Sequence, residues 1–99
     1  MITQDLFNRV VAFLREKGFY PLGWGGTKLE EGKMYRVLQI RKNRRFKKPK
    51  KTWGTLWLEK DGIGGWAIYC WRREKADKLE LLAQKLGEKF NVKVEFHVI

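Results

Sequence analysis

Two stretches of the chain have the hydrophobic spacing of helices. In Leu6–Leu14, apolar residues recur every three or four positions, which places them on one side of a helix. Thr3 is suited to cap the first turn of this helix, and Gly18 is suited to end it. The same spacing recurs in Glu74–Lys89, and Asn91 follows as a residue able to end a second helix. The sequence therefore predicts one helix near each end of the chain.

Strand patterns fill the rest of the chain. Strands are predicted at Lys33–Lys42, Thr52–Glu59 and Ile63–Arg72, and at Val92–Val98, where apolar and polar residues alternate. Phe19–Trp24 contains a proline and a glycine, so it predicts at most a short edge strand. The length of the chain suits a single domain, residues 1–99. The predicted fold is α+β, with a mostly antiparallel sheet of three to five strands and two helices packed on one of its faces.

Alternation along the predicted strands divides their side chains between the two faces of the sheet. One face is mainly aliphatic and is expected to form the core beneath the helices: Met34, Leu38, Ile40, Leu56, Leu58, Trp66, Ile68 and Cys70. The opposite face mixes aromatic, polar and basic side chains: Tyr35, Val37, Gln39, Arg41, Trp53, Thr55, Trp57, Ala67, Tyr69, Trp71 and Arg73. We expect at least two rings of this second face to be accessible, as on a contact surface.

The hairpin between the strands at Thr52–Glu59 and Ile63–Arg72 has two candidate registers. A three-residue loop, residues 60–62, pairs Leu56 with Trp66. A two-residue turn at Asp61 and Gly62 shifts the pairing by one residue and sets Trp57 beside Trp66. The first register is preferred, because it keeps the aliphatic and the aromatic residues on separate faces.

One basic segment gives the strongest indication of function. Arg41–Lys51 contains eight Lys or Arg residues among its eleven positions and no acidic residue. The whole chain has 22 basic and 11 acidic residues. Outside this segment the chain has 14 basic and 11 acidic residues, so most of the excess positive charge lies within the segment. Like charges at this density repel one another and favour a polyanionic partner. Residues 41–52 are expected to form a mobile basic β-hairpin loop that projects from the sheet.

These features predict a non-catalytic nucleic-acid-binding protein with little dependence on base sequence. Phosphates are expected to contact the basic loop at Arg41, Lys42, Arg44, Arg45, Lys47, Lys48, Lys50 and Lys51. Bases are expected to stack on the rings of the aromatic face, Tyr35, Trp53, Trp57, Tyr69 and Trp71, with Arg73 as a further binding residue at the rim of this face. Stacking favours single strands and a basic arm favours a duplex, so both stay open, and DNA is preferred over RNA. A solvated charge run and an anionic membrane surface are the alternative interpretations of the loop.

The residues of most catalytic and metal sites are missing or isolated. The chain has no serine, one cysteine and one histidine, which excludes a serine-based triad and the usual zinc sites. Cys70 lies on the predicted aliphatic face, where a buried thiol is inert. No phosphate loop or dinucleotide motif occurs, so no metal, cofactor or catalytic residue is predicted. The enzymatic alternative is a small metal-independent ribonuclease that uses His97. The third hypothesis is a homodimer or protein-interaction module with the aromatic face as its contact surface.

Composition also indicates the environment of the protein. Serine is absent and Asn and Gln number three each, whereas Lys, Arg and Glu are frequent, a bias typical of hyperthermophile proteins. The longest apolar run, Trp66–Trp71, is too short to span a bilayer. The N-terminal region carries charged residues in a helical pattern, unlike a signal sequence. We expect a cytoplasmic protein that does not associate with membranes.

The order of elements and the second helix resemble one family. The order helix–strand–strand–strand–helix over Thr3–Lys89 is similar to that of double-stranded RNA-binding domains. Lys75, Ala76 and Lys78 also resemble the basic, alanine-bearing start of that family's final helix. The resemblance implies RNA as a partner.

Two shorter segments resemble other nucleic-acid proteins. Leu14–Phe19 looks like the end of the first helix in small HicA-type toxin ribonucleases, whose catalytic histidine on the first strand has no counterpart between Gly18 and Ile40. Two strands that flank a basic loop with Pro49 look like the DNA-embracing arm of HU-type proteins. The first of these resemblances implies ribonuclease activity, and the second implies DNA binding.

Overall fold

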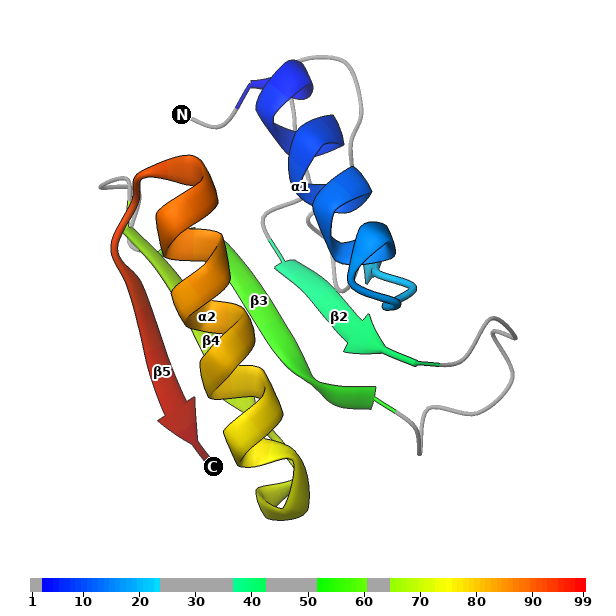
Figure 1. Ribbon diagram of the computed structural model, residues 1–99, viewed down its shortest axis with the longest axis vertical. Helices are drawn as coiled ribbons and strands as arrows, with labels where there is room; N and C mark the ends of the chain where they lie inside the picture. Colours follow the sequence, from blue (N-terminus) through cyan, green and yellow to red (C-terminus); the bar gives the residue numbers. More distant parts are fainter. Residues whose placement is uncertain (1–2, 24–36, 43–51, 61–64) are drawn as a thin grey trace.

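The computed structural model describes residues 3–23, 37–42, 52–60 and 65–99 of the chain (Figure 1). Its elements follow in the order α1 (Gln4–Glu16), β1 (Leu22–Gly23), β2 (Val37–Arg41), β3 (Thr52–Lys60), β4 (Gly65–Cys70), the short 3-10 helix η2 (Arg73–Lys75), α2 (Ala76–Phe90) and β5 (Val94–Val98). This order confirms the predicted α+β class, including a short edge strand. The predictions for Met34, for Tyr35 and for the basic residues from Arg44 to Lys51 lie outside the described residues.

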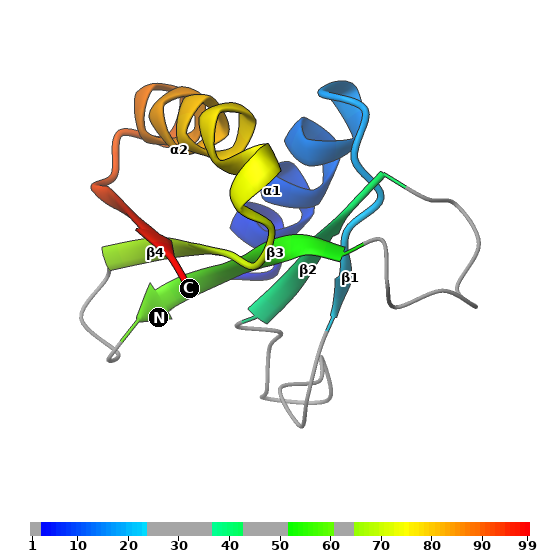
Figure 2. The same cartoon turned by 90° about the horizontal axis from the view of Figure 1, so that it is seen from below.

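The five strands form one sheet with the spatial order β1-β2-β3-β4-β5. The first four strands pair antiparallel, and β5 pairs with β4 in parallel. Parallel neighbours need a crossover connection, which α2 provides. Figure 2 shows α1 and α2 on the same side of the sheet, as predicted, with the other face turned away from both helices. We call that other face the outer face.

The helices begin and end beside the boundary residues that the sequence predicts. The Thr3 hydroxyl oxygen accepts a hydrogen bond from the Leu6 N–H at 3.1 Å, which satisfies one of the open donors at the start of α1. Gly18 follows α1 with a φ of +87°, which glycine adopts without strain. Asn91 ends α2 in the left-handed region, with a φ of 52°. The three predicted boundary residues are confirmed.

The core lies between the two helices and the predicted aliphatic face of the sheet. The helices contribute Val10, Phe13, Leu14, Leu79, Leu82, Ala83 and Leu86. The sheet contributes Leu38, Ile40, Leu56, Leu58, Trp66, Ile68 and Cys70, so the assignment of these seven residues to the core is confirmed. Burial of this apolar surface, and not helix propensity, is the main reason why α1 and α2 are stable.

Gly54 allows β3 to pass close to its neighbours. A Cβ at this position would overlap the Tyr69 carbonyl oxygen and would lie 3.2 Å from Cδ1 of Leu79 on α2. The absence of a side chain therefore permits the close contact of β3 with β4 and with α2.

The register of β3 and β4 differs from both registers considered for their hairpin. Leu56 pairs with Ile68 and Trp57 pairs with Ala67, two residues away from the preferred register. A shift of two residues keeps every side chain on its face, which is why the core assignment survives. Between Trp57 and Lys60 the strand β3 contains one extra residue, because Lys60 pairs with Gly65. This bulge allows a longer connection, residues 61–64, than either predicted turn.

Trp53 does not lie on the outer face, and this prediction is wrong. Gly54 pairs with Ile40 and Thr52 pairs with Arg41, so Trp53 is an extra residue in β3. A bulge of this kind redirects the side chain that it inserts. The indole of Trp53 is buried in the core cluster on the helix side.

Candidate nucleic-acid interface

A groove lies on the helix side of the sheet, where the end of α1, the end of β2 and one side of α2 meet. Its volume is about 310 Å³. Four lysines, two aromatic and two aliphatic residues line it: Lys17, Lys42, Lys78, Lys85, Phe19, Trp53, Leu81 and Leu82. No acidic residue is among those lining residues, so the groove concentrates positive charge above apolar side chains. We call it the lysine groove.

Basic and acidic side chains of α2 occupy different sides of the helix. Lys78 and Lys85 are about two turns apart and both line the lysine groove. Asp77 and Glu80 line a separate hollow of about 270 Å³. Leu81 borders both spaces and separates the two charges. A polyanion is therefore attracted to the groove side of α2 and repelled from the adjoining side.

Lys42 connects the lysine groove to the basic tract of the sequence. It follows β2 directly, and its ammonium group lies 4.3 Å from the centroid of the Phe19 ring and 5.8 Å from the centroid of the Trp53 ring. The same group donates a hydrogen bond to the Lys17 carbonyl oxygen at 3.3 Å. That oxygen belongs to the C-terminal end of α1, where the helix dipole favours a cation. The base of the tract is thus held against α1.

The Trp53 ring lies beneath several ammonium groups. Lys75 and Lys78 place theirs 4.6 Å and 5.7 Å from its centroid, in the range of cation–π contacts. The Trp53 and Phe19 rings pack edge to face, with the two centroids 5.5 Å apart. Only 8% of the Trp53 surface is exposed. Trp53 therefore forms the apolar floor beneath the lysines and offers little surface for a base to stack on.

Within the described parts of the chain, no ion pair involves any of the four groove lysines. The cation–π contacts compensate part of their mutual repulsion, and the remainder is left for an external anion. A polyanion suits this arrangement better than a small ion, because one chain of phosphates can neutralise several ammonium groups together.

Arg41 is turned into the protein and away from the predicted phosphate contacts. Its side chain is 5% exposed, and its Nε donates a hydrogen bond to the Tyr20 carbonyl oxygen at 3.2 Å. In return, the Tyr20 N–H donates to the Arg41 carbonyl oxygen at 2.7 Å. Burial lowers the pKa of the Arg41 guanidinium, because loss of water disfavours its charged form. Arg41 therefore fixes the segment after α1 to β2, and it is not placed to bind phosphate.

The outer face carries a row of three rings across neighbouring strands. Trp57 on β3 contacts Tyr69 on β4 edge to face, with centroids 6.1 Å apart. Tyr69 in turn stacks on His97 of β5 at 5.1 Å, with the ring planes 19° apart. Trp57 is 37% exposed and Tyr69 is half-buried. Trp57 and Tyr69 thus lie on the face predicted for them.

Trp71 and Arg73 lie beyond the end of β4. Trp71 is 40% exposed, and its backbone N–H donates to the Trp53 carbonyl oxygen at 2.8 Å. Arg73 is exposed at the start of η2. Together with Trp57, Trp71 fulfils the expectation of at least two accessible rings. Tyr35 and the tract residues Arg44, Arg45, Lys47, Lys48, Lys50 and Lys51 lie outside the described residues.

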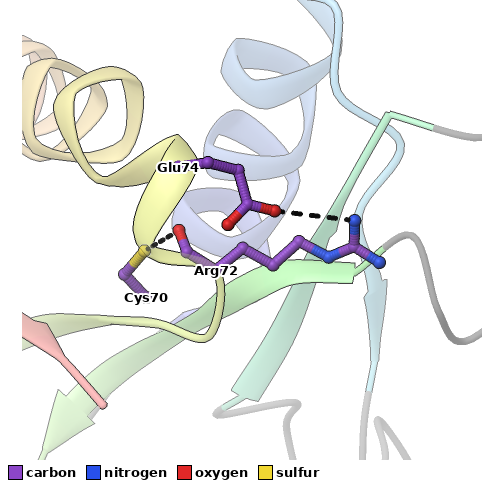
Figure 3. Close-up of polar contacts among 3 residues, drawn as sticks. All are labelled: Cys70, Arg72 and Glu74. Atoms are coloured by element: carbon purple, nitrogen blue, oxygen red, sulfur yellow. Dashed lines mark hydrogen bonds and ion pairs between the residues drawn. The ribbon is translucent and has the colours of Figure 1, made fainter.

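The single cysteine and the single histidine of the chain, Cys70 and His97, are on opposite faces of the sheet. Figure 3 shows the buried Cys70 thiol donating to the Arg72 carbonyl oxygen at 2.9 Å, beside the Arg72–Glu74 ion pair at 4.0 Å. Cys70 belongs to the core cluster, whereas His97 stacks on Tyr69 of the outer face. A Cys70–His97 pair is therefore not formed, and the thiol stabilises the corner between β4 and η2.

Metal and membrane features can be checked in the described ranges. There, no three His, Cys, Asp or Glu side chains lie close enough together to hold a metal ion. Neither described helix combines the length and the apolar character that crossing a bilayer requires.

Three of the four groove lysines, Lys17, Lys78 and Lys85, were not among the predicted phosphate contacts. Lys78 and Lys85 carry a local signal, because a spacing of seven puts them on one side of α2. Lys17 carries none, since only the packing of α1 beside α2 brings it near them.

Comparisons of the chain with protein-family models, with curated proteins and with solved structures gave no match.

Proposed function

We propose that this protein is a non-catalytic nucleic-acid-binding protein that recognises the phosphate backbone with little dependence on base sequence. The observation that carries the proposal is the position of Lys42, which belongs both to the basic tract and to the lysine groove. Six further basic residues follow it in the sequence of the tract: Arg44, Arg45, Lys47, Lys48, Lys50 and Lys51. The proposed interface thus comprises the groove lysines and the tract that begins beside them.

The lysine groove supports a backbone contact more than a base contact. Of its lysines, Lys42 lies over the Phe19 ring and Lys78 over the Trp53 ring, so these rings are covered before any ligand arrives. Phosphates can approach the ammonium groups from outside without disturbing that packing. Lysine also binds as a point charge without a demand for planar geometry, which suits recognition of backbone and not of base edges.

Stacking is proposed for the outer face, at Trp57 and Tyr69. An exposed indole offers a ring face to any base, so such a contact adds affinity without sequence preference. The outer face is on the other side of the sheet from the lysine groove. A flexible single strand could reach both surfaces, whereas a straight duplex would contact one of them at a time. DNA and RNA both satisfy this chemistry. We propose DNA as the first partner to test, and we propose that the protein acts in the cytoplasm.

Fluorescence anisotropy with labelled oligonucleotides tests this proposal. Single- and double-stranded DNA and RNA should each be titrated with the protein at several salt concentrations. If five to eight phosphates are neutralised, the logarithm of duplex affinity should fall against the logarithm of salt concentration with a slope of roughly −4 to −7. A slope near −1 for every polynucleotide would contradict the proposal.

Two controls separate the proposal from its competitors. Vesicles with anionic lipid should bind less tightly than oligonucleotides at equal salt; tighter binding would favour a membrane surface as the partner. Gel analysis of the RNA after long incubation should show intact strands with the unaltered protein. Cleavage that is lost in His97→Ala would favour the ribonuclease alternative.

A further inference from the structure

The two edges of the sheet differ in how they are protected. β1 has only two residues and follows Pro21, so its edge is short and blunt. β5 has five residues in a regular register with β4, without proline or bulge. In the part of the chain that the structure describes, β5 has a neighbouring strand on one side only. Its end exposes apolar surface, since Val98 is 46% and Ile99 is 68% exposed. Unprotected edges of this kind are templates for pairing with another strand.

The hydrogen bonds to β4 show which backbone groups of β5 point outward. The Trp66 N–H donates to the Lys93 carbonyl oxygen at 3.1 Å, and the Ile99 N–H donates to the Cys70 carbonyl oxygen at 2.9 Å. Backbone groups alternate in direction along a strand, so residues 93, 95, 97 and 99 direct theirs toward β4. Val94, Phe96 and Val98 therefore direct their N–H and C=O groups away from the sheet.

These three residues define how β5 can pair with the β5 of a second copy. Antiparallel pairing about a two-fold axis at Phe96 places Phe96 opposite its own copy and Val94 opposite Val98 of the second copy. All three outward-facing residues then form mutual hydrogen-bonded pairs, giving six backbone hydrogen bonds. An axis one residue further along, at His97, keeps only the two pairs between Phe96 and Val98. The hydrogen bonds therefore favour the axis at Phe96.

Polar side chains favour the same axis. With the axis at Phe96, Glu95 lies opposite His97 of the second copy, and this pair of acceptor and donor occurs twice by symmetry. An axis at Glu95 would set the two carboxylates against each other, and an axis at His97 would set the two imidazoles against each other. The sequence of β5 is thus complementary to itself in one register.

We infer that the outer edge of β5 is a homodimerisation surface, in which two copies pair antiparallel about Phe96 and form a continuous ten-stranded sheet. This surface is the strand edge, and it is distinct from the outer face and from the lysine groove. The inference does not depend on the proposed nucleic-acid binding.

The layers of the protein are compatible with this dimer. α2 packs on β4 and β5, so the two copies of α2 lie on the same side of the joined sheet and flank the seam. If each helix lies above the boundary between β4 and β5, two strand spacings separate their axes, roughly 10 Å, as in ordinary helix packing. On the outer face, the row Trp57–Tyr69–His97 continues toward the equivalent row of the second copy. The seam also adds cover to Val94 and Phe96, which are only partly buried in one chain.

Sedimentation equilibrium on nucleic-acid-free protein tests the inference. Salt of about 0.3 M should be present, because each chain has a net charge of +11 and the repulsion must be screened. The protein should show a concentration-dependent equilibrium between one and two chain masses. A single chain mass up to millimolar concentration would overturn the inference.

A charge exchange between positions 95 and 97 tests the register. His97→Glu sets carboxylate against carboxylate, and Glu95→Lys removes the carboxylate that accepts from His97; each change acts twice per dimer and should weaken dimerisation about tenfold. The double variant Glu95→Lys/His97→Glu places an ammonium donor opposite a carboxylate acceptor at both pairs and should recover at least the affinity of the unaltered protein. Glu16→Lys, the same charge change as Glu95→Lys at an exposed position of α1, should have no effect. A double variant as weak as the single variants, or single variants as tight as the unaltered protein, would overturn the pairing about Phe96.

Discussion

The ammonium group of Lys42 lies 4.3 Å from the centroid of the Phe19 ring and donates to the carbonyl oxygen at the end of α1. Through these two contacts the first residue after β2 is fixed to the helix layer. The basic tract that follows therefore begins at a defined place on the surface, beside Lys17 and the basic side of α2. Lys42 should consequently affect both the stability of the domain and its affinity for polyanions.

Lys42→Gln should lower the free energy of unfolding by about 1 kcal/mol. The substitution removes an exposed cation–π contact, which contributes roughly 0.5–1 kcal/mol, and a positive charge at a helix C-terminus, which contributes roughly 0.3–1 kcal/mol. Urea denaturation followed by circular dichroism measures this loss. Lys93→Gln, at an exposed position beside β5, is the matched control and should change stability little. Equal effects of the two substitutions would contradict the role assigned to Lys42.

Gly54→Ala should destabilise the protein by about 3 kcal/mol, near the upper end for overpacking of a core. The added methyl group would overlap the Tyr69 carbonyl oxygen, and backbone cannot move aside as a side-chain end can. Gly65→Ala is the matched control in β4, because a Cβ there meets nothing within 4 Å. Its effect should stay within about 0.5 kcal/mol. Thermal unfolding of both variants gives the comparison, and a tolerated Gly54→Ala would show that β3 lies further from β4 and α2.

Trp53 and Trp57 should respond in opposite ways to truncation. Trp53→Ala removes a buried ring and should cost about 3–5 kcal/mol of stability. Trp57→Ala removes an exposed ring, so stability should change far less, while affinity for single strands should fall by about 1–3 kcal/mol per lost stacked base. Denaturation and anisotropy titrations on both variants separate the two roles. A Trp57→Ala variant with unchanged affinity for single strands would remove the outer face from the interface.

Arg41→Met should reduce stability without altering the salt dependence of binding. The substitution keeps the apolar stem but leaves the Tyr20 carbonyl oxygen without its Arg41 donor, a loss of about 1–3 kcal/mol. Because the guanidinium is buried, no phosphate contact should disappear. Comparison of salt slopes for Arg41→Met and for the unaltered protein checks this point. A shallower slope in the variant would return Arg41 to the phosphate-binding set.

Periodicity predicted the fold well, because burial imposes it on the sequence. The stripes of the two helices and the aliphatic face of the sheet follow from spacing, and the boundary residues Thr3 and Asn91 follow from the capping preferences of Thr and Asn. The assignment of the β3 side chains Leu56 and Trp57 to opposite faces of the sheet was also correct, although the predicted hairpin register was wrong. A shift of two residues changes the partners of Leu56 and Trp57 but keeps the side chains on their faces.

Bulges and buried cations were not accessible to the same reasoning. Trp53 follows the alternation of β3 in sequence, yet one extra residue turns it to the helix side. Arg41 is a basic residue like its neighbours in the tract. Its side chain is nevertheless buried, because it donates a hydrogen bond to the carbonyl oxygen of Tyr20, which is distant in sequence. The lysine groove depends on how α1 and α2 are placed beside β2, and no local pattern contains that information.

The measurement that tests the central claim most directly is the salt slope of duplex binding in two double variants. Lys78→Ala/Lys85→Ala removes two charges from the lysine groove, and Lys89→Ala/Lys93→Ala removes two exposed charges from outside it. If the groove holds phosphates, the first variant should make the slope shallower by about 2, since each contact contributes about 0.9. The second variant should keep the slope of the unaltered protein. Identical slopes in both variants, or a slope near −1 for the unaltered protein, would contradict the account.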